Sequence, residues 1–499
     1  MCLTIVGKLQ RVPYFRVKPT LSTESQKVMK EFRVVTILAS ILLPVPVWAG
    51  GYATARFGGE HGHAASEHVT SLYYNPAGLA FGKGTRVYAE GLFAYRYASY
   101  LRRANAIDNF GSGTPDNDPA ALAANSGEAE LSNVLVSPFL GVVSDLGIDG
   151  LGVGAGFYVP FGGQASWQKN DDFANNAMYP GAVDGTQRWA SIEGYHRVLY
   201  GTVAVAYRLP GPRLSFGIGF NLVRQELETL RARNADGTDD LVGAGGSLKE
   251  GTTLLDGSNT SFAIGAGVMW QPIERLRIGL SYQSMPGFGE SKLDGQLTSQ
   301  FGNGSVGLVD TQLSLVIPDL IRFGVSYKVS PKVEVHLAGD YTRWSTFDRH
   351  CLLVRPSEGD PGECIIDEDG SAGDGAGTVL LGIPRDWKDT FGVRVGGSYW
   401  FSEPFELFGG FGYDSNAIPD DTLEPGFFDM DKLITTAGVR YQILDQKLML
   451  TGSLTNVYYF KRETQPRMTA PELPSRNPDG AGVYEQSINF LTVGAQVSF

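Results

Sequence analysis

The feature that most constrains this 499-residue chain is a strict alternation of apolar side chains with small or polar ones. It begins near Val87 and returns in many segments that are separated by turns. The cleanest examples are Leu151–Val159, Leu214–Leu222, Ile321–Val329, Phe391–Tyr399 and Leu491–Phe499. A period of two residues indicates a β-strand with one apolar face and one polar or small face. The sequence therefore predicts an all-β chain built from many amphipathic strands.

Alternation alone leaves two folds open, because the apolar faces turn inward in a soluble sandwich and outward to lipid in a membrane barrel. Three features favour the barrel. The strands run to about ten residues or more, as a tilted membrane strand requires. Short and long connections alternate. Aromatic residues such as Tyr207, Tyr327, Tyr399 and Tyr441 lie near the short turns, as an interfacial girdle would. We predict a transmembrane antiparallel β-barrel of about 14 strands over residues 85–499, closed so that no edge lies in hydrocarbon.

The connections predict how the barrel is oriented. Short turns are expected at Gly147–Gly150, Pro210–Arg213, Pro272–Glu274, Ser330–Lys332, Ser402–Pro404 and Asp445–Gln446. Long loops are expected at roughly 102–130, 165–190, 230–257, 300–310, 348–384, 416–430 and 461–483. Short turns in the periplasm and long loops outside are typical of outer-membrane barrels. A last amphipathic strand that ends in Phe499 resembles the assembly signature of such barrels.

The N-terminal region predicts export. Residues 1–28 match no usual element and are interpreted as a mis-annotated extension, with the true start at Met29. Residues 29–49 have basic residues, a short apolar stretch and a small-residue site that ends at Ala49, which is the pattern of a secretory signal peptide. The apolar stretch is too short for a stable spanning helix, and no apolar run of about 20 residues follows. Localisation in a Gram-negative outer membrane is therefore expected.

Two cysteines, Cys351 and Cys364, remain after the predicted signal peptide. They lie close together in a polar segment rich in proline and glycine. In an oxidising compartment such a local pair is expected to form one loop disulfide. Two unpaired thiols are the alternative.

Other motifs argue against catalysis and cofactor binding. The net charge of −12 without basic clusters argues against nucleic-acid binding. The glycines of Gly152–Gly156 alternate within a strand and form no phosphate loop. His61, His63 and His68 match no standard metal spacing, and no Gly-x-Ser-x-Gly elbow occurs. We expect no catalytic residue, no metal and no cofactor.

Residues 50–84 do not follow the strand pattern. They are rich in glycine, alanine and histidine and end in a Tyr74-Asn-Pro-Ala-Gly-Leu79 sequence. Pro76 fixes its own backbone and restricts Asn75, whose side chain can bond to local backbone. Gly78 allows close approach of other groups. We predict that this segment folds back into the lumen as a plug, or hatch.

This motif resembles the hatch signature of the FadL/TodX family of outer-membrane transporters of hydrophobic compounds. The segments Tyr341–Trp344, Trp387–Tyr399, Gly410–Asp414 and Ile418–Asp420 also look like late strands of that family. The resemblance covers essentially the whole mature chain. It implies a fourteen-stranded barrel that the hatch occludes, with Asn75, Pro76, Ala77 and Gly78 at the gate.

The resemblance also implies a transport route. Ligand binds at the outer loops, passes to a pocket beside the hatch, and leaves sideways at a kink in the third strand. Here that strand ends with Pro160, Phe161, Gly162 and Gly163, where proline removes a ladder donor and glycine weakens pairing. The alternative is that the strand simply ends there. The alternation places these charged or titratable residues in the lumen: Arg322, Arg394, Arg440, Glu334, His336, Asp340, Glu406 and Asp414.

An arginine near the hatch could hold a ligand carboxylate, and the candidates are Arg322, Arg394 and Arg440. Mutual ion pairing is the alternative for each residue. The leading hypothesis is passive uptake of hydrophobic molecules, long-chain fatty acids or similar compounds, by a monomer. Its expected partners are this ligand, outer-membrane lipids and the barrel assembly machinery. An adhesin or structural barrel, and an outer-membrane enzyme, are the alternatives. Uptake after deletion of Asn75–Ala77 would separate transport from adhesion, and lipid hydrolysis would indicate the enzyme.

Overall fold

The computed structural model describes residues 56–107, 118–243, 246–445 and 447–499. The proposed extension at 1–28, the signal peptide at 29–49 and residues 50–55 of the expected hatch lie outside the described residues. No helix within the described ranges is long and apolar enough to cross a membrane.

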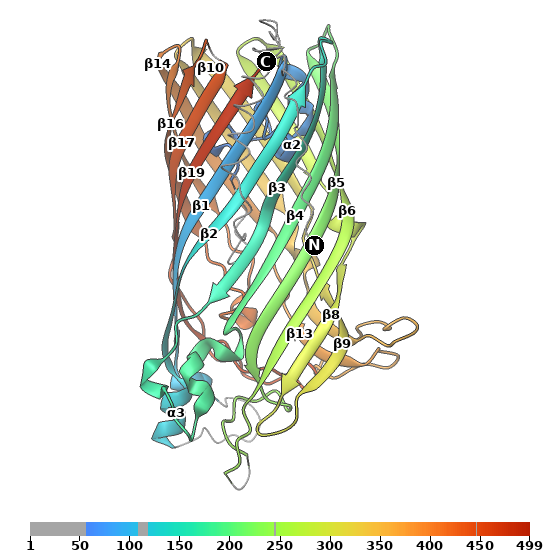
Figure 1. Ribbon diagram of the computed structural model, residues 1–499, viewed down its shortest axis with the longest axis vertical. Coiled ribbons are helices and arrows are strands. Elements are labelled where there is room, and N and C mark those ends of the chain that lie inside the picture. The colour runs from blue at the N-terminus through green and yellow to red at the C-terminus, as the bar shows by residue number, and fades with distance from the viewer. Residues whose placement is uncertain (1–55, 108–117, 244–245, 446) are drawn as a thin grey trace, which may run out of the picture. The chain divides into compact units, whose positions relative to one another are not determined.

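The described strands form one antiparallel sheet (Figure 1). They are β1 (Thr85–Arg102), β2 (Gly127–Ser144), β3 (Leu151–Ser166), β4 (Glu193–Arg208), β5 (Leu214–Arg233), β6 (Gly251–Ile273), β7 (Leu276–Gln283), β8 (Ser291–Gln300), β9 (Gly307–Leu315), β10 (Leu320–Ser330), β11 (Val333–Thr342), β12 (Arg349–Val354), β13 (Val379–Pro384), β14 (Thr390–Ser402), β15 (Phe405–Asp414), β16 (Lys432–Ile443), β17 (Leu448–Tyr459), β18 (Arg462–Glu463) and β19 (Gly482–Ser498). Strand β1 pairs with both β2 and β19, which closes the barrel.

The predicted fold, a closed antiparallel barrel of fourteen strands, is confirmed. Some of these fourteen wall segments are divided into two shorter strands, and we call each wall segment, whole or divided, a stave. The pairs β7 and β8, β9 and β10, β11 and β12, and β13 and β14 each form one interrupted stave, and β18 is a two-residue extension. The interruptions lie at 284–290, 316–319, 343–348 and 385–389 in four neighbouring staves. Pro286, Pro318 and Pro384 lie in or beside three of them, where a residue without an N–H cannot continue a ladder.

The faces of the strands follow the sequence pattern. Outward side chains are apolar and exposed, for example Phe216 at 50%, Ile218 at 53%, Val395 at 57% and Val493 at 51%. Inward residues between them are small or polar, as in the buried Ser215, Asn221 and Thr492. A barrel surface of this kind suits contact with lipid tails rather than water.

Short turns and long loops occupy opposite ends of the barrel, which we call the short-turn end and the long-loop end. The long connections contain α3 (Pro119–Asn125) and the 3-10 helices η3 (Ala104–Ala106), η4 (Asp171–Phe173), η5 (Pro180–Asp184), η6 (Thr186–Trp189) and η9 (Asp420–Thr422). Two more, η7 (Pro286–Phe288) and η8 (Trp344–Thr346), lie in the interruptions. The loop expected at 348–384 is shorter, because β12 and β13 extend the wall into it.

The loops pack together at the long-loop end. Arg188 pairs with Glu250 at 2.7 Å, and Arg102 pairs with Asp239 at 2.5 Å. Both guanidinium groups are almost completely buried, so each needs its acid. In the same region Lys249 lies 2.7 Å from Asp236. Burial raises the pKa of Asp236, but the hydrogen bonds from Lys249 and Thr238 and the charge of Lys249 together outweigh burial and leave the pKa below its usual value.

Candidate functional site

The described part of the hatch, residues 56–84, lies inside the barrel. It contains η1 (Gly59–His61), α2 (Ser71–Tyr74) and η2 (Pro76–Phe81). Helix η2 contacts β3, β4, β5 and β6, whereas η1 contacts β15 and β16 on another part of the wall. All six residues of η2 are buried. The segment therefore fills the lumen between these parts of the wall (Figure 1).

Asn75 organises the hatch. Its Oδ1 accepts a hydrogen bond from the Ala77 N–H at 3.1 Å and caps η2, while Pro76 occupies the first helical position. Its Nδ2 donates to the Ala64 carbonyl at 2.7 Å and to the Val268 carbonyl of β6 at 3.1 Å. One side chain thus joins both parts of the hatch to the barrel wall.

The wall is shaped to receive the hatch backbone. Ser215 donates to the Ala77 carbonyl at 2.8 Å, and Ser281 donates to the Tyr74 carbonyl at 2.6 Å. A Cβ placed on Gly217 would lie 2.3 Å from the Ala77 nitrogen, so only glycine fits there. The small inward residues of the strands therefore admit a close-fitting hatch.

Most of the predicted lumen charges form pairs. Arg394 pairs with Asp340 and with Asp414, the latter at 3.0 Å. The other pairs are Arg440–Glu406 at 3.5 Å, His336–Glu60 at 2.9 Å and Arg277–Glu334 at 3.3 Å. Arg394 and Arg440 therefore each have an acidic partner in the lumen.

Arg322 is held differently. Its Nη1 donates to the Tyr73 carbonyl at 2.9 Å, and its guanidinium lies 4.1 Å from the centre of the Tyr73 ring. Its contacts are therefore with the hatch. Arg322 and Arg394 line one cavity, and Arg440 is not among the residues that line it.

The hatch histidines are dispersed among different partners. His61 lies 2.7 Å from Glu406, and His63 stacks on His336 with the ring centres 4.8 Å apart. No group of three or more potential metal ligands occurs in the part of the chain that the structure describes. The structure joins Cys351 of β12 to Cys364 in a disulfide.

The wall has a discontinuity between β2 and β3, which we call the seam. Pairing of β2 with β3 stops at Phe139 and Tyr158. Beyond that point an isolated bridge joins Leu131 of β2 to Trp167, the residue that follows β3. The register of β3 with β4 also shifts between Tyr158 and Phe161, around Pro160. Figure 1 shows β3 diverging from β2 toward the long-loop end.

Side chains partly replace the missing ladder at the seam. Ser137 donates to the Val159 carbonyl at 2.8 Å, and Asn133 donates to the Gln164 carbonyl at 3.1 Å. Such bonds are fewer than those of a paired strand. Of the four residues assigned to the kink, Pro160 lies at the register shift, and Phe161, Gly162 and Gly163 resume pairing with β4.

An aromatic cluster links the hatch to the seam. Tyr158 stacks on Phe139 with ring centres 5.3 Å apart and contacts Tyr73 of α2 at 5.4 Å. Phe57 of the hatch contacts Phe139 at 5.1 Å. The cluster marks the point where pairing stops. Sequence reasoning missed this cluster, because alternation predicts which side of a strand a ring occupies but not which other rings it contacts.

Two cavities lie in the lumen. The lower cavity, of about 170 Å³, is lined by Tyr73, Tyr74 and Arg322 near the hatch and by Trp344, Trp387 and Phe428 farther out. The upper cavity, of about 440 Å³, lies toward the long-loop end and is lined on the seam side by Leu131, Gly163 and Gln164. The names refer to a barrel with its long-loop end upward, which is the reverse of the view in Figure 1. Phe427 lines both cavities. A volume of several hundred Å³ is typical of small-molecule sites.

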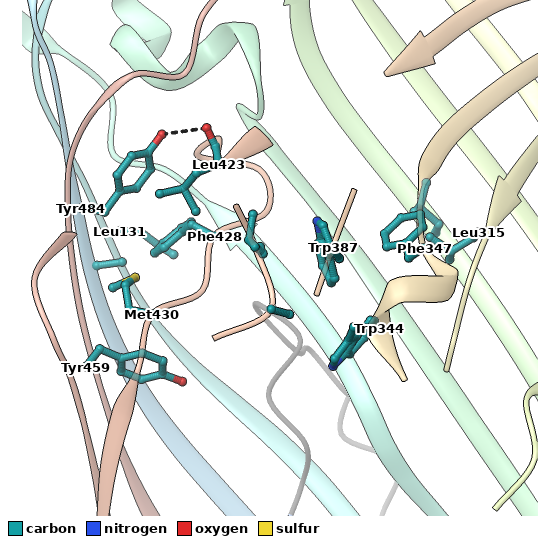
Figure 2. Close-up of a cluster of buried hydrophobic side chains, with 14 of the residues drawn as sticks. Leu131, Leu315, Trp344, Phe347, Trp387, Leu423, Phe428, Met430, Tyr459 and Tyr484 are labelled. Atoms are coloured by element: carbon teal, nitrogen blue, oxygen red, sulfur yellow. Dashed lines mark hydrogen bonds between the residues drawn. The ribbon is translucent and has the colours of Figure 1, made fainter. Parts of the chain in front are cut away.

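Two of the aromatic residues that line the lower cavity, Trp344 and Trp387, come from the interruptions at 343–348 and 385–389. Figure 2 shows Trp344, Phe347 and Trp387 close together, with Phe428 and Met430 nearby. The rings of Trp344 and Trp387 are 4.9 Å apart, as are those of Phe347 and Trp387. The same view shows Tyr484 bonded to the Leu423 carbonyl, at 3.4 Å. The lower cavity thus combines aromatic surface with charged groups such as Arg322 and Asp340, which suits a ligand with both apolar and polar parts.

Comparison with known proteins identifies a family. Residues 47–465 match the family model of the outer membrane protein transport proteins (OMPP1/FadL/TodX). The chain is 22% identical to a putative outer membrane protein of Neisseria meningitidis serogroup B, over 82% of this chain and 86% of that protein. It is 24% identical to a long-chain fatty acid transport protein of Escherichia coli O6:H1, over 47% of this chain and 53% of that protein.

Solved structures share the fold. A Pseudomonas aeruginosa FadL homologue superposes with a TM-score of 0.69 at 16% identity, covering 91% of this chain and 99% of the homologue. The Ralstonia pickettii toluene transporter TbuX gives a TM-score of 0.58 at 16% identity, with coverages of 91% and 99%. The family match confirms the resemblance that the hatch motif suggested.

Proposed function

The chain belongs to the OMPP1/FadL/TodX family of outer membrane transport proteins, and from this premise we propose that it takes up long-chain fatty acids by passive, lateral transport. The family places the barrel in the outer membrane and is one of transport proteins rather than enzymes. The observation that carries the proposal is the seam, where pairing of β2 with β3 stops beside the hatch.

The seam supports a sideways exit for physical reasons. A hydrophobic molecule gains nothing from a water-filled pore, because its transfer into water is unfavourable. A gap in the wall allows it to pass from the lumen to lipid without crossing water. Residues 127–138 of β2 have no ladder to β3, and only two side-chain bonds and the isolated Leu131–Trp167 bridge span the gap in the described residues. Outer-membrane lipids then receive the ligand.

The two cavities support a route in two steps. Ligand enters at the long loops and occupies the upper cavity. It then moves past Phe427, which borders both cavities, to the lower cavity beside Tyr73 and Tyr74 of the hatch. Displacement of the hatch motif at Asn75, Pro76, Ala77 and Gly78 opens the seam, since Tyr73 contacts Tyr158 there.

Long-chain fatty acids are the proposed substrate on two grounds. Several curated relatives are named long-chain fatty acid transport proteins, and the aligned stretches span 53% and 64% of the length of two of them. The two cavities also follow one another along the lumen, with Phe427 in the lining of both. Solved structures of the same fold include toluene transporters, so aromatic hydrocarbons are the substrate class to exclude by experiment.

We further infer that a single chain forms the working unit, since β1 pairs with β19 and leaves no edge to share. The terminal strand β19, which ends next to Phe499, is the segment that the barrel assembly machinery would receive.

The test is Pro160→Val, which restores a backbone donor to β3. We expect the longer β2–β3 ladder to lower the uptake rate of radiolabelled oleate several-fold in cells that have no other fatty acid transporter. Pro210→Val, in the short turn after β4, is the matched control and should leave uptake unchanged. Toluene uptake measured in parallel identifies the substrate class. Oleate uptake at the unmodified rate in well-assembled Pro160→Val protein would favour an adhesin or structural role.

A further inference from the structure

The upper cavity contains two positive charges that the wall leaves uncompensated. Arg231 and Arg233 lie two residues apart on the inward row of β5, and both line the cavity. Within the described residues neither forms an ion pair nor donates a hydrogen bond that the geometry supports. Their side chains are half-buried. A partly desolvated guanidinium without an anion is unfavourable, so the site is electrostatically incomplete.

The acidic residues of the cavity are either bound to another arginine or lie on the outward row of their strand. Glu424 acts on Arg231 electrostatically, but it accepts a hydrogen bond from Arg385 at 2.8 Å. Glu228 belongs to the outward, exposed row of β5. The remaining arginine, Arg96, donates to Gln486 at 2.7 Å. Positive charge therefore exceeds negative charge in this chamber, and the excess lies at Arg231 and Arg233.

The rest of the cavity is apolar on the same side. Leu227 precedes the two arginines on the inward row of β5, and Leu255, Leu313, Leu352 and Leu381 continue the lining from β6, β9, β12 and β13. Successive inward residues of a strand are roughly 7 Å apart. Two long guanidinium side chains at that spacing can reach one anionic group from both sides. The leucines then lie where a hydrocarbon tail would extend.

We propose that the upper cavity is a selectivity site that binds the anionic head of a single-chain amphiphile between Arg231 and Arg233. The proposal rests on the uptake function above and adds a discriminating step to it. An acidic amphiphile is held at the entrance by charge, whereas an uncharged hydrocarbon of the same length gains only the apolar contacts. The arginines near the hatch, Arg322 and Arg394, do not supply this step because they are engaged with the hatch and with acids.

The experiment compares ligands of equal chain length on the full-length protein in lipid nanodiscs of uncharged phospholipid. The probes are dodecanoate, dodecyl phosphate, dodecanol and dodecylamine. The variant Arg231→Gln/Arg233→Gln should weaken dodecanoate binding about tenfold or more, since it removes charge-assisted hydrogen bonds, and should leave dodecanol within about twofold. Arg224→Gln, from the outward row of β5, is the matched control and should change neither.

A charge-reversed variant provides a second readout. Arg231→Glu/Arg233→Glu should prefer dodecylamine to dodecanoate, and Arg231→Lys/Arg233→Lys should retain most of the dodecanoate affinity. If dodecyl phosphate, and not dodecanoate, is the ligand that the Gln variant loses, the head is a phosphate and the site stands. Unchanged affinity for both dodecanoate and dodecyl phosphate in the Gln variant, or a loss of dodecanol affinity equal to that of the anionic ligand, overturns the proposal.

Transport and selectivity can fail separately. Arginine-dependent dodecanoate binding without oleate uptake by cells would contradict the uptake function and retain the site. Uptake that continues in the Gln variant, with the affinities for dodecanoate and dodecyl phosphate both unchanged, would contradict the site alone.

Discussion

Strand β2 has two different neighbours, and their comparison locates the cause of the seam. On one side β2 pairs with β1 along its whole length, from Gly127 to Ser144. On the other side its pairing with β3 covers only Phe139–Ser144. Both strands carry a proline where this ladder stops: Pro138 in β2, next to Phe139, and Pro160 in β3, at the register shift with β4. Neither proline has a backbone N–H to donate. The seam therefore begins where prolines occur in both facing strands.

The largest expected effect comes from abolishing this difference with a covalent link. Asn133→Cys/Gln164→Cys, joined by a short thiol-reactive crosslinker, should hold β2 against β3 and lower oleate uptake about tenfold or more, because a gap that cannot widen cannot pass a chain. Initial uptake rates before and after crosslinking measure the effect. The matched control is a crosslinked Tyr97→Cys/Ser132→Cys pair between β1 and β2, where the strands are already paired. Equal loss of uptake in both proteins would show that the seam has no special role.

A smaller effect is expected at the hatch. Asn75→Ala removes the cap on η2 and both bonds from Nδ2, to Ala64 and Val268. Each lost bond to a buried group costs about 1–3 kcal/mol, so amide exchange in residues 70–81 should quicken and oleate uptake should change several-fold. Hydrogen exchange followed by mass spectrometry measures the first effect. Asn456→Ala, at a side-chain bond on the outward face of β17, is the control. Unaltered exchange in the hatch would contradict the role given to Asn75.

The smallest effect should follow removal of the two bridges across the seam. Ser137→Ala/Asn133→Ala deletes the bonds to Val159 and Gln164. Each bond contributes about 1 kcal/mol to stability, so the midpoint of thermal unfolding should fall by a few degrees. The difference in gel mobility between folded and heat-denatured protein measures this midpoint. Oleate uptake should rise or remain unchanged, because the gap opens more easily. A large fall in uptake would mean that the bridges hold the exit in its working shape.

Much of the fold could be predicted from sequence because it depends on which side of a strand each side chain occupies. That side is set by the neighbouring residues in the sequence. Alternation in segments such as Leu214–Leu222 fixes which side of a strand meets lipid, and turn chemistry fixes where strands end. The irregularity at Pro160 could be anticipated, because the missing N–H of a proline removes a ladder hydrogen bond at that same residue. The interruptions at 316–319 and 343–348 were not predicted, because their inward course depends on contacts between neighbouring staves.

The candidate site was predictable only in part for the same reason. Alternation placed Arg322, Arg394 and Arg440 in the lumen, but it could not assign their partners, which lie far away in sequence. The pairing of Glu60 with His336 and the meeting of Tyr73 with Tyr158 also join distant segments. Arg231 and Arg233 were overlooked because they fall at the edge of an expected loop. They are the inward continuation of β5.

In a regular barrel the same strands set both the width of the passage and the surface that meets the lipid. The interrupted staves allow these two properties to vary separately. A continuous strand holds every side chain at a fixed distance from the barrel axis, so the bore follows from the number of strands. Where a strand breaks, as at 343–348 and 385–389, the chain can carry Trp344, Phe347 and Trp387 inward. Substitutions in these interruptions can widen or narrow the passage, while the outward residues of the strands that contact the bilayer stay the same. Cargo size can therefore diversify without any cost to membrane insertion.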